Sequence, residues 1–383
     1  MALKLKTIAD QPSWIIGVDN VELAVTRRGG HIAPVTFHRD SKKPVQPYHI
    51  SPWQEEKLKI GEPVLVPLRG DFFCVPFGGG SDGRKNYACH GTPAYEQWSL
   101  ADVVQTAELA RLNLTMDCAD SGGHITKTLT LKKGHNVVYS SHVLEGFKGA
   151  FPLGHHATLS MPEEQNSATL STSPLAFGLT FPTPGGNPAA GEYYSLQVNR
   201  KFQRLDKVPT VWKDQPFADC TKYPRAKGFC DVFGVLSKPG IKTPAWCVLA
   251  FPQLGYAWFS LKDSRTLPGL TVWSENHGRW NFPWNGRNNC LGLEDTMSYL
   301  ATGLQPSVKP NPVSKAGITS AMTLSPKKAV AINYIQGVFL INKGFNRVVD
   351  ARFEKGAVNF VGDNKQTVKV PVSHEFLLSG NVG

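Results

Sequence analysis

The sequence predicts an all-β protein, a large antiparallel β-sandwich. Glycine (36 residues) and proline (28 residues) are spread along the 383-residue chain, so they divide it into many short segments and leave little room for long helices. Several of these segments alternate apolar and polar residues, as half-buried strands do. The crossover helices that a parallel sheet needs are missing. The sequence therefore predicts a chain made mostly of short strands joined by turns.

Predicted strands follow one another along the whole chain. Residues 21–25 alternate apolar and polar side chains, and the turn at Gly29 and Gly30 leads to a second strand over 32–37, which predicts a hairpin. The same reasoning predicts later strands over residues 125–131, 137–143, 246–251, 256–261 and 329–341. One short helix is predicted, over Pro162–Ser167.

The strands are predicted to form a single domain over residues 1–383, because β-sandwiches often absorb this many residues into one unit. Two proline-rich stretches, 181–188 and 305–312, are either linkers or long loops. Loops are favoured, since the strand patterns on both sides of each stretch look alike.

Composition narrows the class of protein. Hydrophobic residues make up 41% of the chain and charged residues 19%, which is ordinary for a globular protein that buries a core. The formal charge of +11 comes from scattered lysines and arginines, so an ordinary basic surface is favoured and an anionic substrate, such as a sugar phosphate or an acidic glycan, is the alternative. No nucleic-acid recognition motif is present, so nucleic acid is not predicted as a partner.

The seven cysteines predict buried thiols. Their number is odd and none forms a Cys-x-x-Cys pair, so neither a disulfide framework nor a zinc site is indicated. The opening residues, Met1–Lys6, lack an apolar segment followed by a cleavage site, and no run is long enough to span a bilayer. We therefore expect a cytoplasmic protein without a membrane partner, either a monomer or a homodimer.

The first candidate site is Cys89-His90-Gly91, with Tyr95 and Trp98 shortly after it. It follows the glycine-rich stretch Gly70–Gly80, and glycines let a ligand approach the backbone closely. Aromatic rings can stack on the apolar face of a pyranose. Taken alone, a histidine such as His90 is more often structural than functional.

The second candidate site is the pair His155 and His156, at the end of a strand-like stretch. Successive side chains of a strand point to opposite faces, so both imidazoles cannot enter one pocket and one of them is expected to be structural. Adjacent histidines also occur in metal sites, but no spacing supplies a third ligand. No metal site is predicted.

The third candidate site is a buried strand that runs into an acidic pair, Glu294 and Asp295. Alternation places Leu291, Leu293 and Asp295 on one face, and Gly292 and Glu294 on the other. Glu294 thus projects beside a glycine, where there is room for a ligand. The alternative is a pair of solvated carboxylates at a strand end.

Taken in order, the three sites resemble the motifs of the aldose 1-epimerase, or galactose mutarotase-like, superfamily. His90-Gly91 with Trp98 is similar to the family's first motif, His156 to its middle histidine, and Leu291–Glu294 to its late strand. The hairpin over 21–32 and the Gly70–Gly80 stretch are also similar, so the resemblance covers nearly the whole chain. It implies the family's fold, a large antiparallel sandwich called a supersandwich.

The resemblance also implies a cofactor-independent isomerase that interconverts the α and β anomers of an aldose. A base takes the proton of the C1 hydroxyl while an acid protonates the ring oxygen, and the same groups close the ring on the other face. Glu294 would be the base and His156 the acid. His90 would hydrogen-bond the ring oxygen or a neighbouring hydroxyl. The chemistry implies no metal and no cofactor.

The sequence departs from the family pattern where the sugar is gripped. The family's arginine and aspartate have no obvious match, and Arg84 is the nearest candidate for the arginine. The segment Trp273–Trp280 holds a glutamate, an asparagine, His277 and Arg279 between two tryptophans. This mix is unusual for a plain loop, so the segment is a candidate lining of the pocket. The residues predicted to bind substrate are Arg84, Tyr95, Trp98, His155, His277 and Arg279. The sugar, phosphorylated or not, stays open.

Two alternatives use the same fold. A non-catalytic sugar-binding or sensing protein would be stabilised by sugar without accelerating anomer exchange. A carbon-oxygen lyase or hydrolase would need a second carboxylate near Glu294. Asp295 does not supply it, because a regular strand turns Asp295 away from Glu294.

Overall fold

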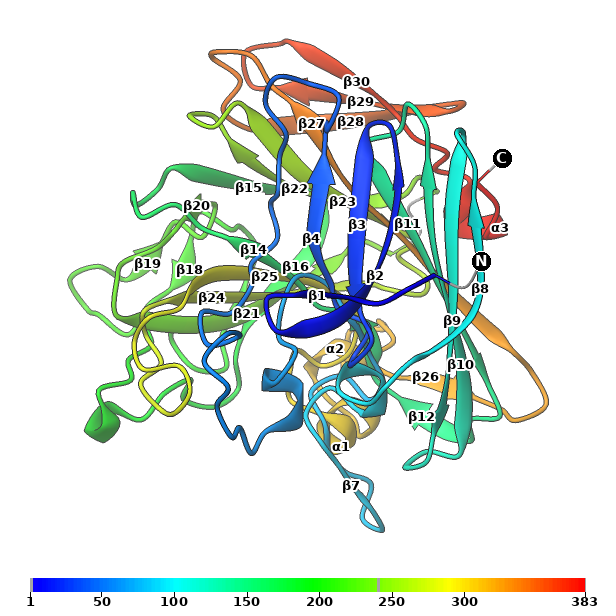
Figure 1. Ribbon diagram of the computed structural model, residues 1–383. Coiled ribbons are helices and arrows are strands. Elements are labelled where there is room, and N and C mark those ends of the chain that lie inside the picture. The colour runs from blue at the N-terminus through cyan, green and yellow to red at the C-terminus, as the bar shows by residue number, and fades with distance from the viewer. Residues whose placement is uncertain (1–2, 240–241, 383) are drawn as a thin grey trace.

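The structure is a computed structural model that describes residues 3–239 and 242–382. Residues 1–2, 240–241 and 383, which belong to the predicted single domain, lie outside the described residues. Every strand pairing within its sheets is antiparallel, and helices are short (Figure 1). The predicted all-β, antiparallel architecture is confirmed.

Two large sheets make up most of the molecule. The nine-stranded sheet has the order β20 (Lys222–Tyr223), β15 (Ala168–Thr172), β22 (Ala245–Phe251), β23 (Tyr256–Lys262), β27 (Val330–Leu340), β11 (Val137–Glu145), β10 (Gly123–Lys132), β9 (Leu109–Cys118) and β8 (Ser99–Gln105). The eight-stranded sheet has the order β17 (Lys201–Phe202), β16 (Leu175–Thr180), β21 (Phe229–Ser237), β24 (Gly269–Asn276), β25 (Asn289–Met297), β13 (Leu153–His155) and β5 (Phe73–Cys74), and β14 (Ala157–Ser160) also pairs with β25.

Smaller sheets cover the large ones. A four-stranded sheet contains β1 (Lys6–Ile8), β2 (Gln11–Val18), β3 (Val21–Thr26) and β4 (Ile32–Phe37), and a three-stranded sheet contains β28 (Val348–Glu354), β29 (Ala357–Gly362) and β30 (Thr367–Pro371). Three two-stranded sheets pair β12 (Gly149–Phe151) with β26 (Met322–Leu324), β18 (Val208–Pro209) with β19 (Phe217–Ala218), and β6 (Gly80–Ser81) with β7 (Asn86–Tyr87). The short helices are α1 (Leu304–Val308), α2 (Pro312–Lys315) and α3 (Phe376–Ser379), with 3-10 turns at Pro63–Leu65, Thr92–Ala94 and Pro188–Ala190.

All seven strands predicted above are present, and consecutive ones form hairpins. β3 pairs with β4, β10 with β11, and β22 with β23. The near-continuous apolar sequence of β22 reflects burial on both faces. Leu249 packs into the core between the large sheets, whereas Val248 packs under the sheet β28–β30, which lies at the top of Figure 1.

Two local predictions were wrong. Residues 162–167 form no helix, because Asn166 has a positive φ of 61° and the side chain of Asn289 binds the carbonyl of Pro162. The stretch 305–312, predicted as a loop, contains α1 and the start of α2. Helix α2 begins at a proline, where no amide donor is needed, and the side chain of Asn311 accepts from the amides of Val313 and Ser314. The stretch 181–188 is a loop, as predicted.

Candidate active site

The register of two strands brings His156 and Glu294 together. β14 pairs with β25 so that Ala157 lies opposite Leu293, which places the preceding His156 level with Glu294. Strand alternation turns Leu293 into the core and Glu294 to the other face. His156 Nε2 lies 3.2 Å from Glu294 Oε1, and both side chains are buried. An imidazole and a carboxyl group are therefore in direct contact.

Gly292 makes room for the Glu294 carboxyl group. A Cβ atom at position 292 would lie 2.6 Å from Glu294 Oε1 and 3.1 Å from the Cβ of Trp273. The space beside this glycine, which the sequence suggested for a ligand, is filled by the glutamate itself. A glycine is required there by packing.

His90 completes the group from a different part of the chain. Its backbone has a positive φ of 65°, and its ring lies 4.8 Å from the ring of His156, edge to face. The amide of Gly78 donates to His90 Nδ1 at 3.3 Å. Because Nδ1 accepts, the proton of the neutral ring is on Nε2. His90 can thus donate a hydrogen bond from Nε2.

Aromatic rings hold the two imidazoles in place. Phe72 stacks on His156 with ring centroids 4.6 Å apart and meets His90 edge to face at 5.7 Å. Phe77 contacts His90 at 5.0 Å. Both phenylalanines are fully buried. The orientation of the site is therefore fixed by packing before any ligand arrives.

These groups line a cavity of about 490 Å³. Its walls come from five parts of the chain: residues 62–90, His156, the loop 181–185, Val232, and residues 273–301. Trp273, Trp284 and Phe282 supply apolar surface, while Asn281, Arg279 and Glu62 supply polar groups. A mostly apolar cavity with a few convergent polar groups is typical of small-molecule sites.

Arg279 is the single lysine or arginine among the described residues that line this cavity. Its guanidinium lies 5.2 Å from the ring of Trp273 and 5.0 Å from that of Trp284, and its Nε lies 3.7 Å from Glu275 Oε2. Glu275 Oε1 also accepts from the amides of Gly278 and Arg279 at 2.8 and 3.1 Å. Glu275 therefore both balances the charge of Arg279 and shapes the loop that carries it.

Burial decides the protonation of the site. It raises the pKa of Glu294 to about 8, although the positive charge of Arg279 acts in the opposite direction. Burial also lowers the pKa of His90 to about 4, with a further lowering by Arg279. The pKa of His156 is well below its ordinary value, through burial and then through His90. Near neutral pH the carboxyl group of Glu294 therefore carries the one titratable proton of the pair, and His156 is neutral.

The structure brings together four of the predicted site residues, Glu294, His156, His90 and Arg279. Their predicted roles stay predictions. The other five predicted residues lie outside this cavity: Arg84, Tyr95, Trp98, His155 and His277.

His155 and Trp98 are structural. His155 is on the opposite face of its strand, as alternation requires; its Nδ1 lies 2.8 Å from Asp71 Oδ2, and its ring stacks on Tyr334. Trp98 is buried, and its Nε1 donates to the carbonyl of Pro93 at 3.1 Å. Neither residue borders the cavity around Glu294, so nothing in the structure supports the predicted part of either in substrate binding.

Three further predicted residues also lie outside the cavity: Arg84, Tyr95 and His277. Arg84 is exposed in the turn between β6 and β7. Tyr95 borders a separate surface hollow. His277 Nδ1 donates to the carbonyl of Gly286 at 2.8 Å and so closes the loop that presents Arg279.

Sequence reasoning assigned no role to Phe72, Phe77 or Trp284. Glu275 belongs to the Trp273–Trp280 segment that was a candidate lining of the pocket, and it lies beside Arg279. Phe72 and Phe77 lie inside the glycine-rich stretch that had been singled out. Trp284 had no local signal, since its role depends on the loop conformation.

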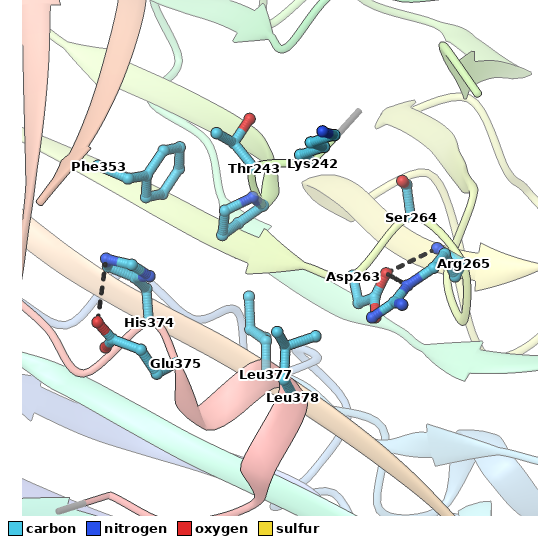
Figure 2. A pocket seen from close by; sticks show the side chains of 11 residues that line it. Lys242, Thr243, Asp263, Ser264, Arg265, Phe353, His374, Glu375, Leu377 and Leu378 are labelled. Carbon is cyan, nitrogen blue, oxygen red and sulfur yellow. Dashed lines mark hydrogen bonds and ion pairs between the residues drawn. The ribbon is translucent and has the colours of Figure 1, made fainter. Parts of the chain in front are cut away.

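A second cavity of about 540 Å³ lies beside α3, bordered by Phe353, Leu377 and Leu378 (Figure 2). Arg265 contacts Asp263 at 2.6 Å and His374 lies 3.7 Å from Glu375, and Lys242 also lines the cavity. It shares no residue with the cavity around Glu294. Size alone does not identify the reactive site, and the buried acid and imidazoles favour the slightly smaller cavity.

Over residues 3–239 and 242–382, no group of three or more histidine, cysteine, aspartate or glutamate side chains is arranged to hold a metal ion. Within the same ranges, no helix has the length and apolarity to cross a bilayer.

Comparison with known proteins adds the fold family. No protein-family model and no curated protein matches the sequence. Among solved structures, a galactose mutarotase-like protein from Clostridium acetobutylicum is similar, with a TM-score of 0.59 and 12% identity over 89% of this chain and 99% of that one. A candidate aldose 1-epimerase from Klebsiella pneumoniae has a TM-score of 0.59 and 14% identity over 87% and 80% of the two chains. A galactose mutarotase-like protein from Lactobacillus casei has a TM-score of 0.54 and 12% identity over 85% and 100%. The chain therefore has the fold of the aldose 1-epimerase, or galactose mutarotase-like, superfamily.

Proposed function

We propose that the protein interconverts the α and β anomers of an aldose by general acid–base ring opening. The observation that carries the proposal is the contact between His156 Nε2 and Glu294 Oε1, at 3.2 Å in a wall of the cavity. Interconversion needs one group that takes a proton and one that gives a proton at the same time. A buried pair that shares a single proton meets this need.

The residues then have distinct roles. Once the proton held by Glu294 has passed to His156 across their 3.2 Å contact, Glu294 takes the proton of the C1 hydroxyl while His156 protonates the ring oxygen, and the C1–O5 bond breaks to give the open-chain aldehyde. After rotation about the C1–C2 bond, the reverse transfers close the ring on the other face. His90 Nε2 donates a hydrogen bond to the ring oxygen or a neighbouring hydroxyl. The proton balance closes within the pair, so the proposal needs neither a metal nor a cofactor.

The charges of the cavity favour a neutral sugar as substrate. Arg279 is matched by the buried Glu275, and Glu62 adds a carboxylate at the wall. A phosphate would find no unpaired cation among the described residues of the wall. The guanidinium, which lies over the rings of both Trp273 and Trp284, instead offers donors to sugar hydroxyls beside apolar ring faces.

The direct test is anomer exchange measured by NMR or polarimetry with a panel of aldoses and aldose phosphates. We expect acceleration by the native protein, and loss of roughly 10²–10⁴-fold of it in Glu294→Gln, since that change removes a proton carrier and keeps the shape. A panel without acceleration, from a protein whose fold is intact by circular dichroism, would contradict the proposal.

The same experiment tests the non-catalytic alternative. A sugar-binding or sensing protein would show sugar-induced thermal stabilisation without any acceleration of anomer exchange. The neighbouring buried Glu294 and His156 favour the enzyme, because a binding protein has no need of a pair that shares a proton.

A further inference from the structure

Exposed aromatic side chains are confined to one region of the surface. In the part of the chain that the structure describes, the phenylalanine, tryptophan and tyrosine side chains more than a third exposed all lie in two segments, 193–217 and 280–282. They are Tyr193, Trp212, Phe217, Trp280 and Phe282. Exposed apolar surface that gathers in one place marks an interaction site.

The two segments are joined into one surface. Glu192 Oε1 accepts from the amides of Trp280 and Asn281 at 3.0 and 3.2 Å. Gly278 packs so closely on Phe229 that a Cβ at 278 would lie 2.3 Å from the carbonyl carbon of Phe229. The ring of Phe229 in turn meets that of Trp212 at 5.7 Å. In Figure 1 this region, with β18 and β19, lies at the left of the molecule.

Trp280 is held in place although it is exposed. A Cβ at Gly286 would lie 2.8 Å from the indole ring, and one at Gly191 would lie 3.7 Å from it. The ring therefore rests on two glycines while 54% of the residue remains exposed. A ring fixed in this way loses little conformational freedom when it binds a ligand.

The aromatic surface is continuous with the cavity. Phe282, two residues after Trp280, lines the cavity together with Asn281. Asn281 places an uncharged amide beside the rings, which suits hydroxyl groups as both donor and acceptor. A ligand that fills the cavity and extends outward past Phe282 would meet Trp280 next.

We propose that this surface, Tyr193, Trp212, Phe217, Trp280 and Phe282, binds the further units of a neutral oligosaccharide whose reducing-end sugar occupies the cavity. The inference rests on the proposed function and extends it to the substrate class. Each ring offers a face on which the apolar C–H face of a pyranose can stack. The reducing end is the one unit of such a chain with a free anomeric hydroxyl, and the cavity holds the acid–base pair that acts on it.

The test compares chain lengths. Anomer exchange is measured by NMR for glucose and for α- and β-linked glucose disaccharides and trisaccharides, with the native protein, Trp280→Ala and Trp212→Ala. Leu254→Ala is the matched control, because Leu254 is equally exposed, at 53%, but lies in the turn between β22 and β23. We expect a higher kcat/KM for trisaccharide than for glucose. In Trp280→Ala we expect a loss of roughly tenfold for the trisaccharide and less than twofold for glucose.

A second readout separates this inference from the proposed function. Calorimetric titration with the same saccharides measures binding without catalysis. Chain-length-dependent binding that Trp280→Ala removes, without any acceleration of exchange, would support the surface and contradict the enzyme. Equal effects of Trp280→Ala on glucose and trisaccharide, or trisaccharide binding as weak as glucose binding, would overturn the inference and indicate another occupant, such as a protein.

Discussion

Two side chains, Glu294 and His156, decide the chemistry that we propose. Both are common residue types, and burial gives them their unusual pKa values. Burial raises the pKa of the Glu294 carboxyl group to about 8 and lowers the pKa of the His156 imidazole well below its ordinary value. The pair therefore exists in a form with one proton over a wide range around neutral pH.

This form predicts the pH dependence of kcat/KM. As the pH rises through about 8, the pair loses its shared proton and His156 has none to give, so the rate falls. At acidic pH, below the lowered pKa of His156, both groups are protonated and no base remains, so the rate falls again. A plateau between these limits, measured by polarimetry over the full range, is the expected result. A rate that keeps rising above pH 8 would contradict the shared proton.

Gly292 offers a second prediction at the same scale. In Gly292→Ala the new methyl group would displace the Glu294 carboxyl group, from which it would lie 2.6 Å. We expect a loss of activity of roughly 100-fold, since small displacements of a reacting group cost about this much. Gly61→Ala is the control, because a Cβ at 61 meets nothing within 4 Å. Equal activities of the two variants would show that the position of the carboxyl group is not critical.

At the scale of elements, strand β24 and the loop after it together position Arg279. Glu275, at the end of the strand, accepts from two loop amides and lies beside the Arg279 guanidinium. The strand fixes Glu275, Glu275 fixes the loop, and the loop places Arg279 over the rings of Trp273 and Trp284. In the reaction that we propose, Glu275 would therefore position Arg279 for substrate without touching the substrate itself.

Glu275→Gln separates these contributions. The amide oxygen can still accept from the loop amides, but the charge that balances Arg279 is lost. We expect KM to rise roughly tenfold with kcat changed less, because the proton carriers are untouched. Glu22→Gln, at an exposed surface pair with Arg39, is the control. A fall in kcat alone would place Glu275 in the chemical step instead.

At the scale of the whole molecule, a buried ion pair joins the two large sheets. Asp295 of β25 contacts Lys262 of β23, and its Oδ2 accepts from Ser260 at 2.6 Å and from Tyr334 at 2.9 Å. Asp295 points away from Glu294, as the alternation of the strand predicts. The two neighbouring acids therefore serve different purposes, one in the cavity wall and one between the sheets.

Breaking this pair tests its part in stability. Asp295→Asn leaves Lys262 buried without its charge partner, and we expect a loss of about 3–5 kcal/mol in the free energy of unfolding. Urea denaturation measures it. The double variant Asp295→Asn with Lys262→Met should recover part of the loss, since no unpaired charge remains. A single variant as stable as the native protein would show that the pair does not hold the sheets together.

Period-two alternation made much of this structure predictable. It predicts the seven strands, and it assigns Glu294 and Asp295 to opposite faces of their strand. It also required one of His155 and His156 to be structural. Alternation does not reveal which face of a strand borders a cavity, which is why the sequence also predicts His155 as a binding residue.

The sequence by itself determined the antiparallel β class, because period-two alternation is carried by neighbouring positions. Through the order of its motifs, which resembles that of a known family, it also predicted Glu294, His156 and His90 as site residues. Tertiary structure alone decided that Arg279 faces the cavity while Arg84 does not, and that Glu275 and Trp284 support it. Loop conformation and cross-strand register create these contacts between residues distant in the chain, and a one-residue change of register would send every side chain of a strand to the other face.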